Sequence, residues 1–228
     1  MRKYKLTSET KLWFDRTLYR IRALIDIKEH GVKKGDLGGW VETEKNLSHD
    51  GAAWVGGLAV VCDAAQVCDG DLVSDSAVVY DAARVSGSAQ VCDGAQVSGA
   101  AVICETARVS GAALVSGAAV VGGSARVGGK AVVSGLALVS GSARVNSSTQ
   151  LLTVGPIGSR GNTITFFNGV NKKIMVSCGG FRGDIDQFVA HIRATYGDSK
   201  HARACLAAVE LAKIQVDSSV TDNVVLIP

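Results

Sequence analysis

An unbroken spacing of six residues between aliphatic side chains constrains this chain more than any other feature. Seventeen such anchors run from Val55 to Leu151, and all but Ile103 and Leu151 are valine. Two places before each anchor lies alanine, except at Asp71 and Thr149. A period of six matches neither the 3.6-residue period of a helix nor a strand that continues. The spacing therefore predicts short strands joined by corners and stacked in equivalent coils.

The alternation of side chains in a strand assigns a direction to each position of the six-residue unit. The anchor and the alanine two places before it point to the same side, so both face inward and the residue between them faces outward. The corner falls two places after the anchor, where Asp or Gly accepts unusual backbone angles. The expected corners include Asp63, Asp69, Asp75, Asp81, Asp93, Gly111, Gly117, Gly123, Gly129, Gly135 and Gly141. Stacked coils then bury one continuous aliphatic column.

The six-residue units resemble the hexapeptide repeats of left-handed parallel β-helices, in which three units form one triangular coil. They are similar to the N-A-x-V-x-G repeats of phage and prophage proteins and of bacterial relatives named as hexapeptide acyltransferases. The flanking segments "KKGDLGGWVETEKNLS", "GPIGSRGNTITFF" and "CGGFRGDIDQFVAHI" resemble the segments on either side of those repeats. The resemblance implies a mainly β fold, with a left-handed β-helix between an N-terminal β cap and a small C-terminal α+β module.

Three parts of the chain are expected. Residues 1–50 form the cap, in which "TLYRIRALIDI" alternates as a strand does and closes the open edge of the first coil. Residues 51–151 form the β-helix. Residues 152–228 form the α+β module, with a hairpin turning near residues 168–171. Two helices follow the hairpin, the first between Asp184 and Gly197 and the second capped by Asp198 or Ser199.

With three units in a coil, residues eighteen apart stack at about 4.8 Å, the spacing of neighbouring strands. The outward residues form three columns: Trp54, Leu72, Gln90, Arg108, Arg126, Arg144; Val60, Val78, Gln96, Leu114, Val132, Gln150; and Gln66, Arg84, Val102, Val120, Leu138. The last two columns are mostly aliphatic, which is typical of an interface. The resemblance implies a homotrimer, and the expected contacts are Val102, Leu114, Val120, Val132 and Leu138. Alternatively, the terminal segments fold back over these faces.

Positive charge suggests two places for an anionic ligand. The column of Arg108, Arg126 and Arg144 either holds an anion or extends its guanidinium groups into water. In the C-terminal part, "GPIGSRGN" is a glycine-rich loop whose backbone amides can form an anion nest, or it is simply a tight turn. Its candidate ligand-binding residues, with basic residues near the two expected helices, are Ser159, Arg160, Arg182, Lys200 and Arg203.

No catalytic residue, metal ligand or cofactor is predicted. The four histidines are His30, His49, His191 and His201, and all lie outside the repeats from Val55 onward. Four cysteines directly follow an anchor where serine stands in other units, so we interpret them as small corner residues. The cysteines have no zinc-type spacing and are expected to be reduced thiols in a cytoplasmic protein.

A non-enzymatic binding protein is therefore the expected function. The phage resemblance adds a concrete form, an accessory protein in the host cytoplasm that captures a host defence factor or an anionic nucleotide. A hexapeptide-type acyltransferase and a structural, polymer-forming protein are the alternatives. The net charge of +3 is too small to favour nucleic-acid binding, and no apolar run of membrane-spanning length predicts insertion in a bilayer.

Overall fold

The computed structural model describes residues 2–218, and they divide into two compact units after Ser148. The first unit is a parallel β-solenoid with an antiparallel N-terminal extension. The second is a four-stranded antiparallel sheet with two helices. Among the described residues, no helix combines the length and the apolar character that crossing a membrane requires.

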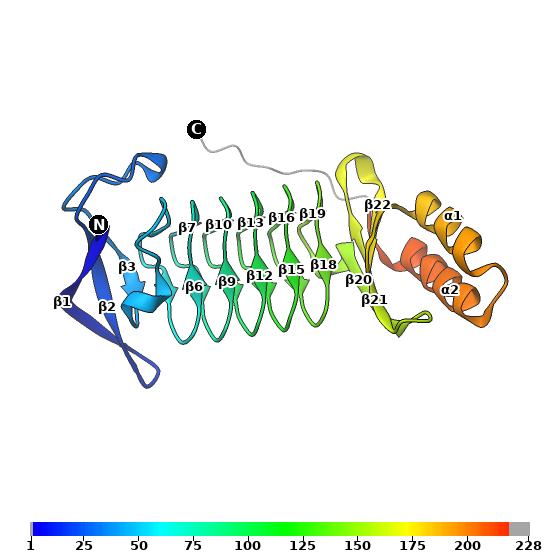
Figure 1. Cartoon of the computed structure of the whole chain (residues 1–228), viewed down its shortest axis with the longest axis horizontal. Coiled ribbons are helices and arrows are strands. Elements are labelled where there is room, and N and C mark those ends of the chain that lie inside the picture. The colour runs from blue at the N-terminus through cyan, green and yellow to red at the C-terminus, as the bar shows by residue number, and fades with distance from the viewer. Residues whose placement is uncertain (1, 219–228) are drawn as a thin grey trace. The chain divides into compact units, whose positions relative to one another are not determined.

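Two-residue strands build the solenoid, and they stack into three parallel sheets (Figure 1). The six-stranded sheet contains β4 (Trp54–Val55), β7 (Leu72–Val73), β10 (Gln90–Val91), β13 (Arg108–Val109), β16 (Arg126–Val127) and β19 (Arg144–Val145). The five-stranded sheet contains β6 (Gln66–Val67), β9 (Arg84–Val85), β12 (Val102–Ile103), β15 (Val120–Val121) and β18 (Leu138–Val139). Each strand pairs with the strand eighteen residues away, as the period predicts.

The third solenoid sheet continues into the N-terminal residues. It contains β1 (Tyr4–Trp13), β2 (Arg16–Ala23), β3 (Leu37–Val41), β5 (Val60–Val61), β8 (Val78–Val79), β11 (Gln96–Val97), β14 (Leu114–Val115) and β17 (Val132–Val133). β1 and β2 form an antiparallel hairpin, and β3 pairs with β5 in parallel. The N-terminal segment therefore extends this sheet beyond the first strand that the repeat contributes to it, β5.

Aliphatic side chains fill the solenoid, as expected. The anchor valines and the alanines two places before them are buried throughout. The exception is Asp71, which occupies an alanine position and is fully buried. Its Oδ1 atom accepts a hydrogen bond of 2.8 Å from the Ala89 amide, and burial raises the pKa of its carboxyl to about 7. One ionisable group thus lies inside an otherwise apolar column.

The corners have the backbone conformation that their residue types predict. Every residue two places after an anchor, from Gly57 to Gly141, has a positive φ. Five of these corners are aspartates with φ between 57° and 60°, and Glu105 has a φ of 61°. Asp tolerates this left-handed conformation better than most residues, and Gly adopts it freely. The choice of Asp or Gly therefore follows from the turn between strands.

The repeat ends sooner than its sequence pattern. Gln150 was expected to face outward in the second column, but it is buried in a short 3-10 helix, Ser148–Gln150. The last anchor, Leu151, begins a strand of the second unit. Three further 3-10 helices lie at Lys28–His30, Glu44–Asn46 and Val170–Lys172. Aliphatic spacing alone does not reveal the end of the repeat, because a strand of a different sheet supplies the same residue type.

The second unit has its own apolar core. Its sheet contains β20 (Leu151–Ile157), β21 (Asn162–Asn168), β22 (Ile174–Cys178) and β23 (Phe181–Asp184). The helices are α1 (Ile185–Tyr196) and α2 (Lys200–Gln215). Asp184 caps α1, Gly197 ends it, and Ser199 caps α2, so these predicted boundaries are confirmed. Phe166 and Phe188 meet edge to face across the buried core.

Candidate functional site

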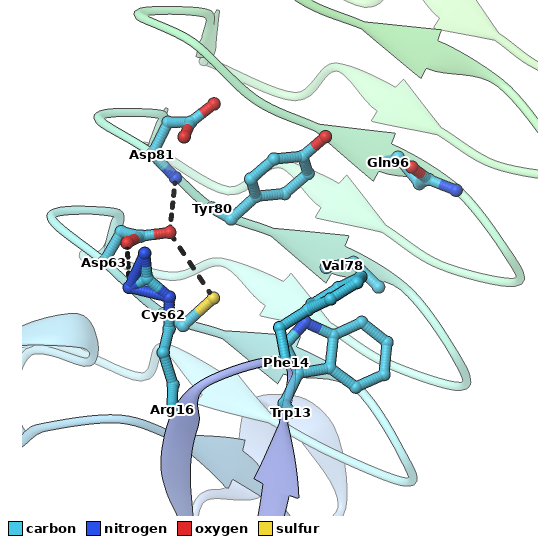
Figure 2. A pocket seen from close by; sticks show the side chains of 9 residues that line it. All are labelled: Trp13, Phe14, Arg16, Cys62, Asp63, Val78, Tyr80, Asp81 and Gln96. Carbon is cyan, nitrogen blue, oxygen red and sulfur yellow. Dashed lines mark hydrogen bonds and ion pairs between the residues drawn. The ribbon is translucent and has the colours of Figure 1, made fainter.

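A pocket of about 540 Å³ lies where the β1–β2 hairpin reaches over the solenoid (Figure 2). Its lining residues are Trp13, Phe14, Arg16, Cys62, Asp63, Val78, Tyr80, Asp81 and Gln96. The first three come from the hairpin turn, and the others come from three successive coils that contain β5, β8 and β11. Figure 2 shows the Tyr80 ring on one side of the pocket and Trp13 and Phe14 on the other. The volume is within the usual range for small-molecule sites.

The hairpin turn presents an aromatic side chain in an unfavourable backbone conformation. Trp13 pairs with Arg16, so Phe14 and Asp15 are the two central residues of the turn. Phe14 has a φ of 50°, where a turn of this kind prefers glycine. Its side chain is 82% exposed and meets the Trp13 ring edge to face at 5.5 Å. The turn thus holds a large apolar group in solvent, at the rim of the pocket.

Tyr80 is the aromatic side chain that the solenoid contributes. It directly follows the anchor Val79, a position that holds glycine, serine, cysteine or asparagine after each of the other anchors from Val55 to Val145. Cys62 occupies the same position one coil earlier and is buried. Burial, followed by the nearby Asp63 charge, raises the pKa of the Cys62 thiol to about 12. The pocket therefore contains a protonated thiol rather than a thiolate nucleophile at neutral pH.

Three charged groups connect the hairpin to the solenoid at the edge of the pocket. Arg16 forms an ion pair with Asp63, and its guanidinium lies 3.7 Å from Glu42. The Asp63 amide donates to Glu42 Oε2 at 2.7 Å. Asp81 lies at the next corner, where its Oδ2 atom accepts from the Gly99 amide at 2.9 Å. In residues 2–218, no basic side chain forms an ion pair with Asp81.

The predicted anion-binding residues of the second unit lie around the turn between β20 and β21. Ser159 and Arg160 are exposed in that turn, and Ser159 Oγ is 3.4 Å from the hydroxyl of Tyr196 at the end of α1. Lys200 and Arg203 are exposed on the first turn of α2, which begins four residues later. A Cβ atom at Gly158 would lie 3.8 Å from Cys205 Sγ, so the turn and the N-terminal half of α2 are neighbours.

Arg182 reaches the same end of the sheet from β23. Its Nη1 atom donates to the carbonyls of Gly179 and Phe181, both at 2.8 Å. The N-terminus of α1 that follows is capped by Asp184, whose Oδ1 accepts from the Gln187 amide at 3.0 Å. Because a carboxylate already occupies this helix N-terminus, any anion there would have to bind Arg182 rather than the helix amides.

The predicted arginine column is present in the six-stranded sheet. Arg108 pairs in register with Arg126, and Arg126 with Arg144. Arg108 Nη2 donates to Cys92 Sγ at 3.5 Å, and Arg144 Nη1 donates to the Ser124 carbonyl at 3.2 Å. The column is therefore a row of neighbouring positive charges. Its first and last members, Arg108 and Arg144, also donate hydrogen bonds to other residues of the solenoid.

The predicted interface residues stay on the surface of the later coils. Leu114 and Val132 are 39% and 40% exposed, whereas Val102, Val120 and Leu138 are half-buried. At the first coil the two columns differ. Val60, which begins the column of Leu114 and Val132, packs with Leu18 and Trp40 of the N-terminal segment and is buried, whereas Gln66, which begins the other column, is exposed.

Histidines do not line the pocket. The His49 ring stacks on Tyr4 at 4.3 Å, and its Nδ1 accepts from the Lys3 amide at 3.3 Å. His191 stacks on Phe181 at 5.1 Å. Burial lowers the pKa of both His30 and His49. These contacts give His49 and His191 packing roles.

Asp75, Cys92 and Asp93 form a small group that could in principle hold a metal ion. Their ligand atoms lie within 4.8 Å of one another. However, burial raises the pKa of the Cys92 thiol, and the Arg108 guanidinium is hydrogen-bonded to its sulfur. A cation would have to displace this positive group. The six cysteines of the chain all lie among the described residues and are free.

The pocket was not among the sites predicted from the sequence. Tyr80 was the residue of the pocket that the sequence could have indicated, because it is the one bulky residue directly after an anchor between Val55 and Val145. No sequence pattern indicated the ion pair between Arg16 and Asp63, since it depends on how the hairpin packs on the solenoid. Compared with the models of known protein families and with curated proteins, the chain matches none.

Proposed function

We propose that this protein is a non-enzymatic binding protein, in which the solenoid is a rigid spine and the C-terminal unit binds an anionic small molecule such as a nucleotide. The observation that carries the proposal is the group of exposed basic side chains around the β20–β21 turn. Arg160, Lys200 and Arg203 form no ion pair with an acidic group in the described part of the chain. Gly158 and Gly161 give the turn positive φ angles, which allow backbone amides to converge on an anion.

The rigidity of the spine supports this function. Backbone amides of each coil donate to carbonyls of the next, as between Val102 and Ala119 and between Val120 and Ala137, both at 2.9 Å. These bonds repeat along the solenoid without an inserted loop. A scaffold of this kind holds its binding groups at low entropic cost.

The finer form of the proposal follows the resemblance to phage and prophage repeat proteins. In this form the coils are left-handed, and the protein is an accessory factor in the host cytoplasm that captures an anionic nucleotide signal or a host defence protein. The arginine column of Arg108, Arg126 and Arg144 is a second place for such an anion. Its regular spacing supports binding of a ligand with more than one negative charge.

The active form in this proposal is a homotrimer. Leu114 and Val132 stack in one apolar column, and Val102, Val120 and Leu138 stack in the neighbouring one. Packing these columns against another copy would bury apolar surface that is now partly exposed. Light scattering coupled to size exclusion measures the mass, and changing Leu114 and Val132 together to lysine should reduce a trimer to a monomer. Leu58→Lys, at an exposed leucine of the first coil, is the control.

Titration calorimetry with ATP and with adenosine tests the ligand class. ATP should bind and adenosine should not, because the proposed contacts are to phosphate. Arg160→Ala and Arg182→Ala should each weaken ATP binding about tenfold, which is typical for the loss of one charge-assisted contact. Arg193→Ala removes an exposed arginine of α1 and should leave binding unchanged. Equal weakening by all three variants would show that only net charge matters.

A further inference from the structure

We propose that the pocket beneath the β1–β2 turn is a second binding site, and that it takes an organic cation with an alkylammonium or guanidinium group. Two independent features support this ligand class. Aromatic rings form opposite sides of the pocket, and its charged groups carry an excess of negative charge. The site belongs to the first unit and is independent of the anion site proposed for the second.

The aromatic rings suit a cation because the face of each ring carries partial negative charge. Trp13 and Phe14 come from the hairpin, and Tyr80 faces them from the solenoid (Figure 2). The same hairpin already holds one ammonium group in this manner. Lys11 Nζ lies 4.7 Å from the ring centre of Trp40 and 5.4 Å from that of Trp13. Lys11 itself does not line the pocket.

The charges at the edge of the pocket favour the same ligand. Arg16 is the one basic residue in the lining, and its guanidinium is held by Asp63 and Glu42. Two carboxylates thus surround one guanidinium, and Asp81 adds a third negative charge beside them. Asp81 uses Oδ2 for the Gly99 amide. An ammonium or guanidinium group in the pocket would reach this carboxylate while its alkyl part lies against the rings.

The backbone conformation of Phe14 indicates that its exposed side chain has a functional role. A positive φ costs an ordinary residue roughly 1 kcal/mol relative to glycine. Burial does not compensate for this cost, because the side chain is 82% exposed and its aromatic contact is with the adjacent Trp13. Strain of this kind at a pocket rim is typical of ligand-binding residues. We therefore assign Phe14 as the residue that covers the cation.

Calorimetry on the full-length protein with two matched pairs of probes tests the ligand class. Choline is compared with 3,3-dimethylbutan-1-ol, which has the same shape without the charge. Acetylarginine methyl ester is compared with the citrulline ester, in which a neutral urea replaces the guanidinium. At least one cation should bind more tightly than its neutral partner. A preference for choline identifies a small ammonium ligand, and a preference for the arginine ester identifies an arginine side chain of a partner.

Two variants locate the binding in this pocket. Asp81→Asn keeps the side-chain oxygen that accepts from Gly99 but removes the charge, so cation affinity should fall about threefold to tenfold. Asp93→Asn is the control, because Asp93 is a corner residue with a φ of 59° whose Oδ2 accepts from the Gly111 amide. It lies outside the pocket lining, and this variant should bind as the wild type does.

Phe14→Gly separates binding from folding. Glycine suits the turn, so the variant should unfold at a higher temperature than the wild type while binding the cation about threefold less tightly. A merely structural role for Phe14 would instead lower stability and leave affinity unchanged. Equal affinity for a cation and its neutral counterpart, or equal loss in Asp81→Asn and Asp93→Asn, overturns the proposal.

Discussion

Asp63 and Asp81 occupy the same corner of successive coils, and the Oδ2 atom of Asp63 accepts a hydrogen bond of 3.2 Å from the Asp81 amide. Asp81 in turn accepts from the Gly99 amide at 2.9 Å. Similar bonds join Asp69 to Gly87 and Asp93 to Gly111. Corner carboxylates therefore connect coil to coil in the first half of the solenoid, in addition to the backbone bonds between strands.

Asp63 should stabilise the protein more than other corner aspartates, because it also holds Arg16 of the hairpin. Asp63→Ala is expected to lower the free energy of unfolding by about 1 kcal/mol more than Asp93→Ala, which removes a corner carboxylate without an ion pair. Urea denaturation measures both values. Hydrogen exchange should show faster opening of the β1–β2 hairpin in Asp63→Ala alone. Equal losses in the two variants would mean that the ion pair adds nothing.

Asp71 should make stability depend on pH. Its pKa is raised to about 7 in the folded protein, from an ordinary value near 4. Between these two values the folded chain keeps a proton that the unfolded chain has released. Each pH unit in that window then lowers the wild-type free energy of unfolding by at most about 1.4 kcal/mol, and the loss is complete above the folded pKa.

Asp71→Asn removes this dependence, since the amide oxygen can still accept from Ala89 and the side chain does not titrate. The variant should therefore gain stability relative to the wild type as pH rises from about 4 to about 7. Thermal unfolding at several pH values measures the difference. Asp75→Asn, the same exchange at an exposed corner, is the control. A difference that does not change with pH would contradict a neutral buried carboxyl.

The arginine column should make stability depend on salt. Arg126 lies between Arg108 and Arg144, and neighbouring like charges on one sheet face destabilise by roughly 0.2–1 kcal/mol per pair. Arg126→Gln should raise the unfolding temperature at low salt, and the gain should shrink as salt screens the charges. Lys130→Gln removes an exposed charge outside the column. If both variants behave alike, the effect comes from net charge.

Two glycine corners should differ in their tolerance of alanine. A Cβ atom at Gly129 would meet the Asn146 carbonyl oxygen, whereas one at Gly135 has open space around it. Both glycines have positive φ angles, of 54° and 67°. Both variants thus carry backbone strain, but Gly129→Ala should lose about 1–3 kcal/mol more because of the clash. Chemical denaturation of the two variants provides the comparison.

The solenoid was predictable from the sequence because every coil repeats the same local arrangement of inward side chains and corner residues. The inward valines and alanines, the left-handed corners and the eighteen-residue stacking all follow from the six-residue period. The caps at Asp184 and Ser199 were predictable for a similar reason, since they depend on neighbours three residues away. The pocket was not predictable, because the contact of Arg16 with Asp63 joins residues that no periodicity relates.

Because each coil has three sides, insertions of eighteen and of six residues have different effects, although both preserve the six-residue period of the sequence. Insertion of eighteen residues adds one rung to every face, so the arginines stay above arginines and the aliphatic residues above aliphatic residues. Insertion of only six residues preserves the core equally well, because valine still follows valine inward. It would nevertheless turn every later side chain onto the next face, so that an insertion between Gln96 and Arg126 would move Arg126 into the column of Val78 and Gln96. An insertion of six residues would therefore change which side chains share each face of the solenoid, while the apolar interior stays the same.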